Sequence, residues 1–200
     1  LFSPSDVPGL YEAFFADQDK FEELYVKYEQ DPTIRKRTVK AVEIFSLLMQ
    51  ERASTGRIYI QNVDHCNTHS PFDPQVAPVR QSNLCLEIAL PTKPLQHIND
   101  ENGEIALCTL SAFNLGKIES LDELEELADL AVRSLDALLD YQDYPVVAAK
   151  RSSLARRSLG IGVINYAYYL AKNGVRYSDG SANDLTHRTF EAIQYYLLKA

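Results

Sequence analysis

The stretch that decides how the rest of the chain is interpreted reads Ser82-Asn83-Leu84-Cys85-Leu86-Glu87-Ile88-Ala89-Leu90. From Asn83 onward, polar and apolar residues alternate, which is the period of an extended strand with two unlike faces. Asn83, Cys85 and Glu87 would share one face, about 6.5–7 Å from one to the next. At that spacing an amide, a thiol and a carboxylate can all touch one sugar-sized ligand. A carboxylate flanked by leucines is costly to bury unless it is paired or protonated.

This pattern allows two interpretations. The first is an amphipathic edge strand whose polar face lies in water, because period-2 alternation is common and one cysteine proves little. The second is a reaction site built from three groups on one face.

Three stretches of the sequence resemble the large, catalytic subunit of aerobic (class I) ribonucleotide reductases, and most closely its bacterial members. Residues 78–87, Pro-Val-Arg-Gln-Ser-Asn-Leu-Cys-Leu-Glu, resemble its active-site loop. Residues 56–64, Gly-Arg-Ile-Tyr-Ile-Gln-Asn-Val-Asp, and residues 107–116, Leu-Cys-Thr-Leu-Ser-Ala-Phe-Asn-Leu-Gly, are also similar to that subunit, as is nearly all the remaining chain. The resemblance favours the catalytic interpretation.

The resemblance implies a role for four residues. Cys85 corresponds to the cysteine that abstracts a hydrogen atom from the ribose as a thiyl radical, which makes the neighbouring 2′-hydroxyl a good leaving group. Glu87 corresponds to the general base for the 3′-hydroxyl, and Asn83 to the amide that hydrogen-bonds the substrate's hydroxyls. Cys108 corresponds to one half of a redox pair that delivers two electrons; without the resemblance it would be a small buried strand residue. Cys66 matches no catalytic cysteine.

Radical chemistry makes particular demands on the residues around the thiol. Thiolate formation, the usual measure of cysteine reactivity, is not what hydrogen abstraction needs. An apolar setting that excludes water would protect the radical, and Leu84 and Leu86 are expected to supply it.

The resemblance also implies partners. These are a ribonucleoside diphosphate as substrate, a small subunit whose metal-generated tyrosyl radical starts the reaction, thioredoxin or glutaredoxin as reductant, and a second copy of the full-length large subunit. No cofactor or metal ion is expected in this chain, and the ATP and deoxynucleotide effectors would bind outside it. In the family the second redox cysteine, the shuttle cysteines, the relay tyrosines and the phosphate-binding loop lie largely or wholly outside this stretch. The chain alone is therefore expected to be inactive. The alternatives are a scaffold fragment that binds a partner without chemistry, and a glycyl-radical relative with the same barrel.

Composition sets the outer limits. A chain of 200 residues with 46% hydrophobic content suits one domain or a piece of a larger one, and both ends are interpreted as cut from a longer subunit. No apolar run approaches the roughly 20 residues that a membrane span needs. Three widely spaced cysteines form no disulfide framework, which fits a reducing cytoplasm. A net charge of −8 argues against a nucleic-acid groove.

The coarse pattern is helix-rich with a few separated strands, which indicates an α/β fold. Helices are predicted over residues 10–16, around 21–28, over 35–53, from about 123 to 141, through 166–170 to a C-cap at 173–174, and over 185–200. Asp31-Pro32 is interpreted as the start signal, a cap and a first-turn proline, of the helix over 35–53. Strands are predicted over 57–63, from 83, and over 104–111, with a proline-rich loop over 64–80. By resemblance the chain is part of a ten-stranded α/β barrel with its catalytic finger loop, divided into a helical lead-in (1–55), strands and finger loop (56–116) and helical barrel wall (117–200).

Two motifs are weak. His65, Cys66 and His69 lack the second ligand pair of a zinc site. Gly160 and Gly162 with Asn165 form Gly-x-Gly-x-x-Asn at a predicted helix start, near Arg156 and Arg157. A dinucleotide fingerprint needs a preceding strand and a third glycine, which are missing here. These glycines are expected to allow close helix packing.

Overall fold

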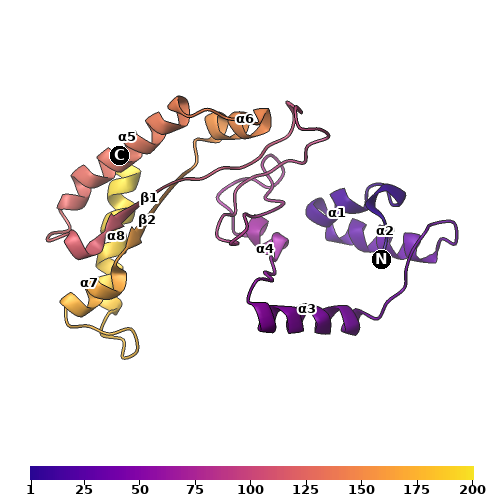
Figure 1. Ribbon diagram of the computed structural model, residues 1–200, viewed down its shortest axis with the longest axis horizontal. Helices are drawn as coiled ribbons and strands as arrows, with labels where there is room; N and C mark the ends of the chain where they lie inside the picture. The colour runs from indigo at the N-terminus through magenta and orange to yellow at the C-terminus, as the bar shows by residue number, and fades with distance from the viewer. The chain divides into compact units, whose positions relative to one another are not determined.

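A computed structural model describes residues 1–200, which form two compact units, residues 1–94 and 95–200. The first unit contains the helices α1 (Leu10–Ala16), α2 (Gln18–Gln30), α3 (Ala41–Thr55) and α4 (Val63–Thr68), after a 3₁₀ turn η1 (Pro4–Asp6) (Figure 1). The second contains β1 (Thr109–Asn114), η2 (Leu115–Lys117), α5 (Glu123–Tyr141), α6 (Val147–Arg156), β2 (Leu159–Ile164), α7 (Tyr166–Lys172) and α8 (Asn183–Lys199). No helix is long and apolar enough to cross a membrane.

In the first unit, α1 and α2 form a helical pair, as the sequence predicts. Leu10 and Ala13 of α1 are buried, and the Asp17 carboxylate caps α2 by accepting the Lys20 amide at 2.9 Å. The predicted helix over 35–53 is real but begins later, at Ala41. The reason is that Asp31, interpreted as a start signal, ends α2 instead, because its side chain accepts hydrogen bonds from Thr33 in a local turn.

Two further predictions in this unit are wrong. Residues 57–62 form no strand, because none of them has a partner strand to complete its hydrogen bonds. Residues 64–80 are not wholly irregular either, since α4 begins at Val63 and runs to Thr68 before the first proline of that region.

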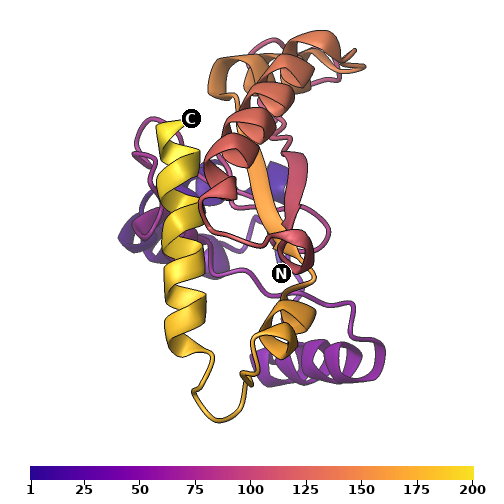
Figure 2. The ribbon, with the colours of Figure 1, turned by 90° about the vertical axis from the view of Figure 1, so that its left-hand side faces the viewer.

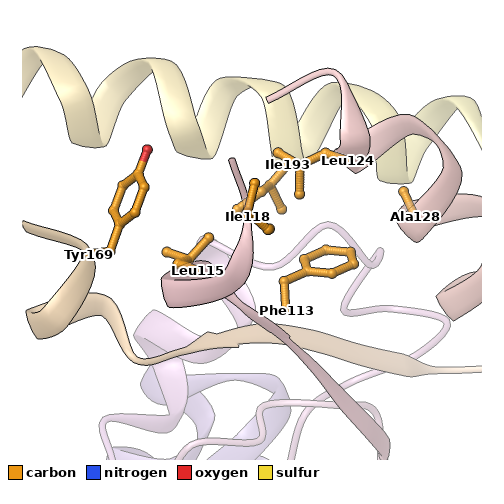
Figure 3. Close-up of a cluster of buried hydrophobic side chains, with 7 residues drawn as sticks. All are labelled: Phe113, Leu115, Ile118, Leu124, Ala128, Tyr169 and Ile193. Carbon is orange, nitrogen blue, oxygen red and sulfur yellow. The ribbon is translucent and has the colours of Figure 1, made fainter. Parts of the chain in front are cut away.

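The second unit is a two-stranded parallel sheet covered on one face by helices. β1 pairs with β2 in parallel, with Thr109 opposite Leu159 and Asn114 opposite Ile164. The helices α5 and α8 lie side by side over this pair (Figure 2). The buried side chains between them come from β1, the η2 region, α5, α7 and α8: Phe113, Leu115, Ile118, Leu124, Ala128, Tyr169 and Ile193 (Figure 3). The Tyr169 hydroxyl points toward α8 and lies 3.0 Å from the Thr189 hydroxyl.

Three of the four α-helices of this unit, α5, α7 and α8, are predicted from the sequence, but neither strand is predicted where it lies. The helix α5 spans the predicted 123–141, with three glutamates in its first turn, where the helix dipole favours them. The predicted strand over 104–111 is shifted to 109–114. The region of Gly160 and Gly162 was predicted to begin a helix and is instead the strand β2. The helix α6 was not predicted.

An ion-pair clip joins α5 to the end of α6. Arg157 has a left-handed backbone (φ 50°), and its guanidinium donates to Asp136 at 2.6 Å and to Asp140 at 2.9 Å. These hydrogen bonds from Arg157 lower the pKa of both carboxyls below the ordinary 3.8, and they raise the pKa of the guanidinium. These bonds hold Arg157, two residues before β2 begins, against α5.

Candidate functional site

Three of the four predicted site residues, Asn83, Cys85 and Glu87, lie at the tip of a loop, residues 78–92, which we name the finger. Its two sides run next to each other: the Thr92 amide donates to the Pro78 carbonyl at 3.2 Å, and the Arg80 amide donates to the Thr92 hydroxyl at 3.3 Å. Farther along, the Ser82 hydroxyl donates to the Ile88 carbonyl at 2.6 Å. Residues 83–87 are thus presented at the end of a hydrogen-bonded stem.

The tip itself is a tight turn, which corrects the predicted strand. The Leu86 amide donates to the Asn83 carbonyl at 3.2 Å, and Leu86 has a left-handed backbone (φ 63°). Cys85 occupies the middle of this turn and is exposed. The alternation from Asn83 therefore does not mark the two faces of a strand, and the shared strand face expected for Asn83, Cys85 and Glu87 does not exist.

The side chain of Asn83 explains why the turn forms. Its Oδ1 accepts the Ile88 amide at 3.0 Å and lies 3.2 Å from the Ser82 hydroxyl, so it closes the turn from inside. An asparagine that binds nearby backbone in this way competes with strand formation. Because Oδ1 is used for this, the Nδ2 group of Asn83 remains a donor for an acceptor outside the loop.

The base of the finger is held by Asn67 of α4. Its Nδ2 donates to the carbonyls of Val63 and Val79, both at 2.8 Å, and its Oδ1 accepts the Val79 amide at 2.8 Å. Val79 is fully buried, so these bonds satisfy backbone groups that water does not reach.

A second anchor is the side chain of Arg80. Its Nη2 forms a 2.8 Å ion pair with Glu12 of α1, and its guanidinium lies 5.2 Å from the centre of the Phe15 ring. The finger is thereby fixed at its base to α1 and α4, while its tip carries Asn83, Cys85 and Glu87.

The tip is open within this unit. Cys85 and Glu87 are exposed, and Leu84 is 89% exposed. The apolar shelter expected from Leu84 is therefore not formed here, because that side chain points away from the rest of the unit.

Cys108 belongs to the second unit. It directly precedes β1, is half-buried, and lies over Gly160 of β2. The segment before it is tied to α6, since the Ile105 amide donates to the Ala148 carbonyl at 3.3 Å and Arg156 pairs with Glu104 at 2.7 Å. Two elements, α6 and β2, thus set the position of this thiol.

His65, Cys66 and His69 lie in or next to α4. Cys66 is half-buried and accepts a hydrogen bond from Gln61 at 3.4 Å, while the rings of His65 and His69 meet edge to face. No group of three or more His, Cys, Asp or Glu side chains is arranged to hold a metal ion.

Comparison with known proteins assigns this arrangement to a family. The family model described as "Ribonucleotide reductase, barrel domain" matches residues 1–200. The chain belongs to the ribonucleotide reductase barrel-domain family. The sequence-based identification of the family and of an α/β barrel fragment is therefore confirmed.

Individual relatives of this reductase barrel are very similar in sequence. The chain is 84% identical over 200 residues to ribonucleoside-diphosphate reductase 1 subunit alpha of Salmonella typhimurium, and 83% to the protein of that name in Escherichia coli. It is 70% identical to ribonucleoside-diphosphate reductase subunit alpha of Buchnera aphidicola. In each case all of this chain is covered but only 26% of the relative, so the chain spans about a quarter of their length.

Several residues that shape the finger, or that lie against Cys108 in the second unit, are not predicted from the sequence. Ser82 and Asn67 act through hydrogen bonds to backbone groups, and the Ser-Asn pair at 82–83 is turn chemistry that signals a loop. From its motif Gly160 is expected to allow helix packing, whereas the structure places it in the strand β2. The signal that indicates a strand is a glycine within an apolar, β-branched run, which marks a close approach of another chain segment. Nothing in the sequence signals the anchoring role of Arg80.

Proposed function

We propose that this chain is the part of a ribonucleoside-diphosphate reductase alpha subunit that carries the radical cysteine and one redox cysteine. The observation that carries the proposal is the 83–84% identity over the entire chain to proteins named for that activity. The finger supports it, because it presents an exposed thiol, a carboxylate and an amide within five residues. The same names favour the reductase over the glycyl-radical relative considered above.

The reaction converts a ribonucleoside diphosphate to its 2′-deoxy form. Two thiols lose two electrons and two protons and form a disulfide, while the C2′–OH bond is replaced by C2′–H and one water leaves. The difficulty is that the 2′-hydroxyl is a poor leaving group until a hydrogen atom has been removed from C3′. A thiyl radical at Cys85 performs that removal, because S–H and activated C–H bonds are similar in strength, and it regains the hydrogen atom at the end.

The other residues of the tip handle protons and position the sugar. Glu87 accepts the proton of the 3′-hydroxyl as the general base, and its exposure at the tip leaves it accessible to substrate. Asn83 donates from Nδ2 to a substrate hydroxyl oxygen, since its Oδ1 is committed to the Ile88 amide. One residue thus both shapes the turn and orients the ribose.

Cys108 supplies one of the two reducing thiols, and its partner is a cysteine of the longer protein. The small subunit of a class I reductase supplies the oxidising radical, and thioredoxin or glutaredoxin restores the thiols. Effector nucleotides and the second copy of the alpha subunit bind through other parts of the full-length protein. The need for free thiols places the reaction in the reducing cytoplasm.

The full-length protein tests the proposal directly. It is reduced, freed of external reductant, mixed with the small subunit and a ribonucleoside diphosphate, and allowed to react until turnover stops. We expect deoxyribonucleoside diphosphate, and mass spectrometry should find Cys108 in a disulfide while Cys85 and Cys66 remain thiols. Absence of deoxynucleotide, or product formed with Cys108 still a thiol, would refute the assignment.

A further inference from the structure

The two faces of the β1–β2 pair differ sharply. Phe113, Ile161 and Val163 pack into the core under α5 and α8. The opposite face carries Leu110 and Ile164, which are 66% and 53% exposed. Because side chains alternate along a strand, Gly160 lies on this helix-free face, directly opposite Leu110.

Gly160 leaves room that the thiol of Cys108 fills. A Cβ atom built at this glycine would lie 2.6 Å from Cys108 Sγ and 2.5 Å from Leu110 Cδ2. Distances below 3.0 Å are not tolerated, so any side chain at this position would push the sulfur aside. Gly162 lies two residues further along the same face, and a Cβ built there meets no atom within 4 Å.

The backbone of Gly160 does not itself call for glycine. Its φ lies outside the left-handed region, in which four other glycines of the chain are found. Glycine in a strand interior weakens the strand and contributes no packing. A glycine that the backbone does not require, placed under a thiol, is accounted for by the space that the thiol occupies.

We propose that Gly160 is a positioning residue for Cys108, which sets where the reducing thiol lies and thereby the rate of the redox step. This inference rests on the proposed function, in which Cys108 is one half of the redox pair. Disulfide formation needs an S–S distance of about 2.05 Å and a narrow dihedral range, so it depends strongly on where each sulfur lies. With alanine at position 160 and no other change, the new methyl group would lie 2.6 Å from Cys108 Sγ. Ordinary van der Waals contact begins at 3.4 Å, so the sulfur would have to move by about 0.8 Å.

The matched pair Gly160→Ala and Gly162→Ala in the full-length reductase tests this. Both add one methyl group to the same face of the same strand, but only the first touches Cys108. For Gly160→Ala we expect kcat to fall by about 10–100-fold, as for other misplacements near 1 Å, with KM within about threefold of wild type. For Gly162→Ala, kcat should stay within about threefold.

A second measurement does not depend on turnover. In the reduced protein, the rate at which Cys108 is alkylated by iodoacetamide, followed by mass spectrometry, should change by more than about threefold in Gly160→Ala and not in Gly162→Ala. The double variant Gly160→Ala/Leu110→Ala removes the contact between the new methyl group and Leu110 but keeps its contact with Cys108. Its kcat should therefore stay as low as that of Gly160→Ala, because the thiol is still displaced.

The outcomes separate this inference from the proposed function. Equal effects of the two alanines, an unchanged alkylation rate in Gly160→Ala, or full recovery in the double variant would overturn the positioning role. If instead wild-type protein forms no deoxynucleotide, or Cys108→Ser is as active as wild type, the proposed function fails, while the alkylation comparison still reports on the position of the thiol.

Discussion

Replacing Asn67 by alanine should lower the local stability of the finger at its base, although Asn67 lies outside the tip residues 83–87. Asn67 makes three hydrogen bonds, two of which satisfy the amide and carbonyl of the buried residue Val79. In Asn67→Ala these two backbone groups lose their partners where water does not reach them. The finger then loses its tie to α4, although no residue of the tip has changed.

The size of the effect follows from the two orphaned groups. A buried donor or acceptor left without a partner costs about 1–3 kcal/mol, so the loss of two such partners should lower the local stability at the base of the finger by about 2–6 kcal/mol. Since 1.4 kcal/mol is a factor of ten, the backbone amides of residues 79–82 should exchange with solvent about 30- to 20,000-fold faster.

Hydrogen exchange of the full-length protein, followed by mass spectrometry of peptides covering the finger, measures this change. Asn62→Ala is the matched control, because Asn62 precedes α4 and its side chain makes no capping hydrogen bond. Asn67→Asp is a second variant: it keeps an acceptor for the Val79 amide but turns a carboxylate oxygen toward two carbonyls, so it should be at least as damaging. If Asn67→Ala exchanges as slowly as Asn62→Ala, the argument that Asn67 holds the finger is wrong.

Two further predictions concern the proposed general base, Glu87, and the ion-pair clip of Arg157. Glu87→Gln in the full-length protein should slow the first chemical step by about 10²–10⁴-fold, the usual loss for a general base, and unchanged single-turnover kinetics would remove Glu87 from the mechanism. Arg157 lowers the pKa of Asp136 and Asp140 below 3.8, so its stabilising effect is present well above pH 3.8 and is lost as the pH falls through the lowered values. Arg157→Gln should therefore lower the thermal unfolding temperature at pH 6 more than at pH 3. The control Arg133→Gln breaks an exposed ion pair with Asp129 and should change the unfolding temperature little at either pH. An equal loss at both pH values in Arg157→Gln would contradict a stabilising role for the ion-pair clip.

The helices were predictable where local signals agree. In α5 the apolar period, the acidic first turn and the reach of Glu123 back to the Ser120 amide at 2.8 Å all indicate the same helix. The helix α1 has its predicted bounds, and α8 begins two residues before its predicted start. Local consistency of this kind needs no knowledge of the distant chain.

The strands and the finger were not predictable in this way. The strand β2 forms because β1 pairs with it, and this pairing cannot be predicted from the local sequence. The two glycines of β2 belong to a Gly-x-Gly motif that indicates a helix start, so the local pattern favours the wrong element. At the finger, one side-chain oxygen of Asn83 outweighs an alternating pattern, because no sheet buries the apolar side. The roles proposed for Cys85 and Cys108 rest on family resemblance, since a lone thiol in a loop indicates no chemistry by itself.

The most direct test of the account compares Cys85→Ser with Cys66→Ser in the full-length protein. Serine keeps a small hydrogen-bonding side chain, but its O–H bond is too strong to yield a useful radical. We predict that Cys85→Ser forms no deoxyribonucleoside diphosphate while binding substrate within about threefold of wild type, and that Cys66→Ser retains activity. Turnover by Cys85→Ser within about tenfold of wild type would contradict the central claim that this thiol at the tip of the finger performs the hydrogen abstraction.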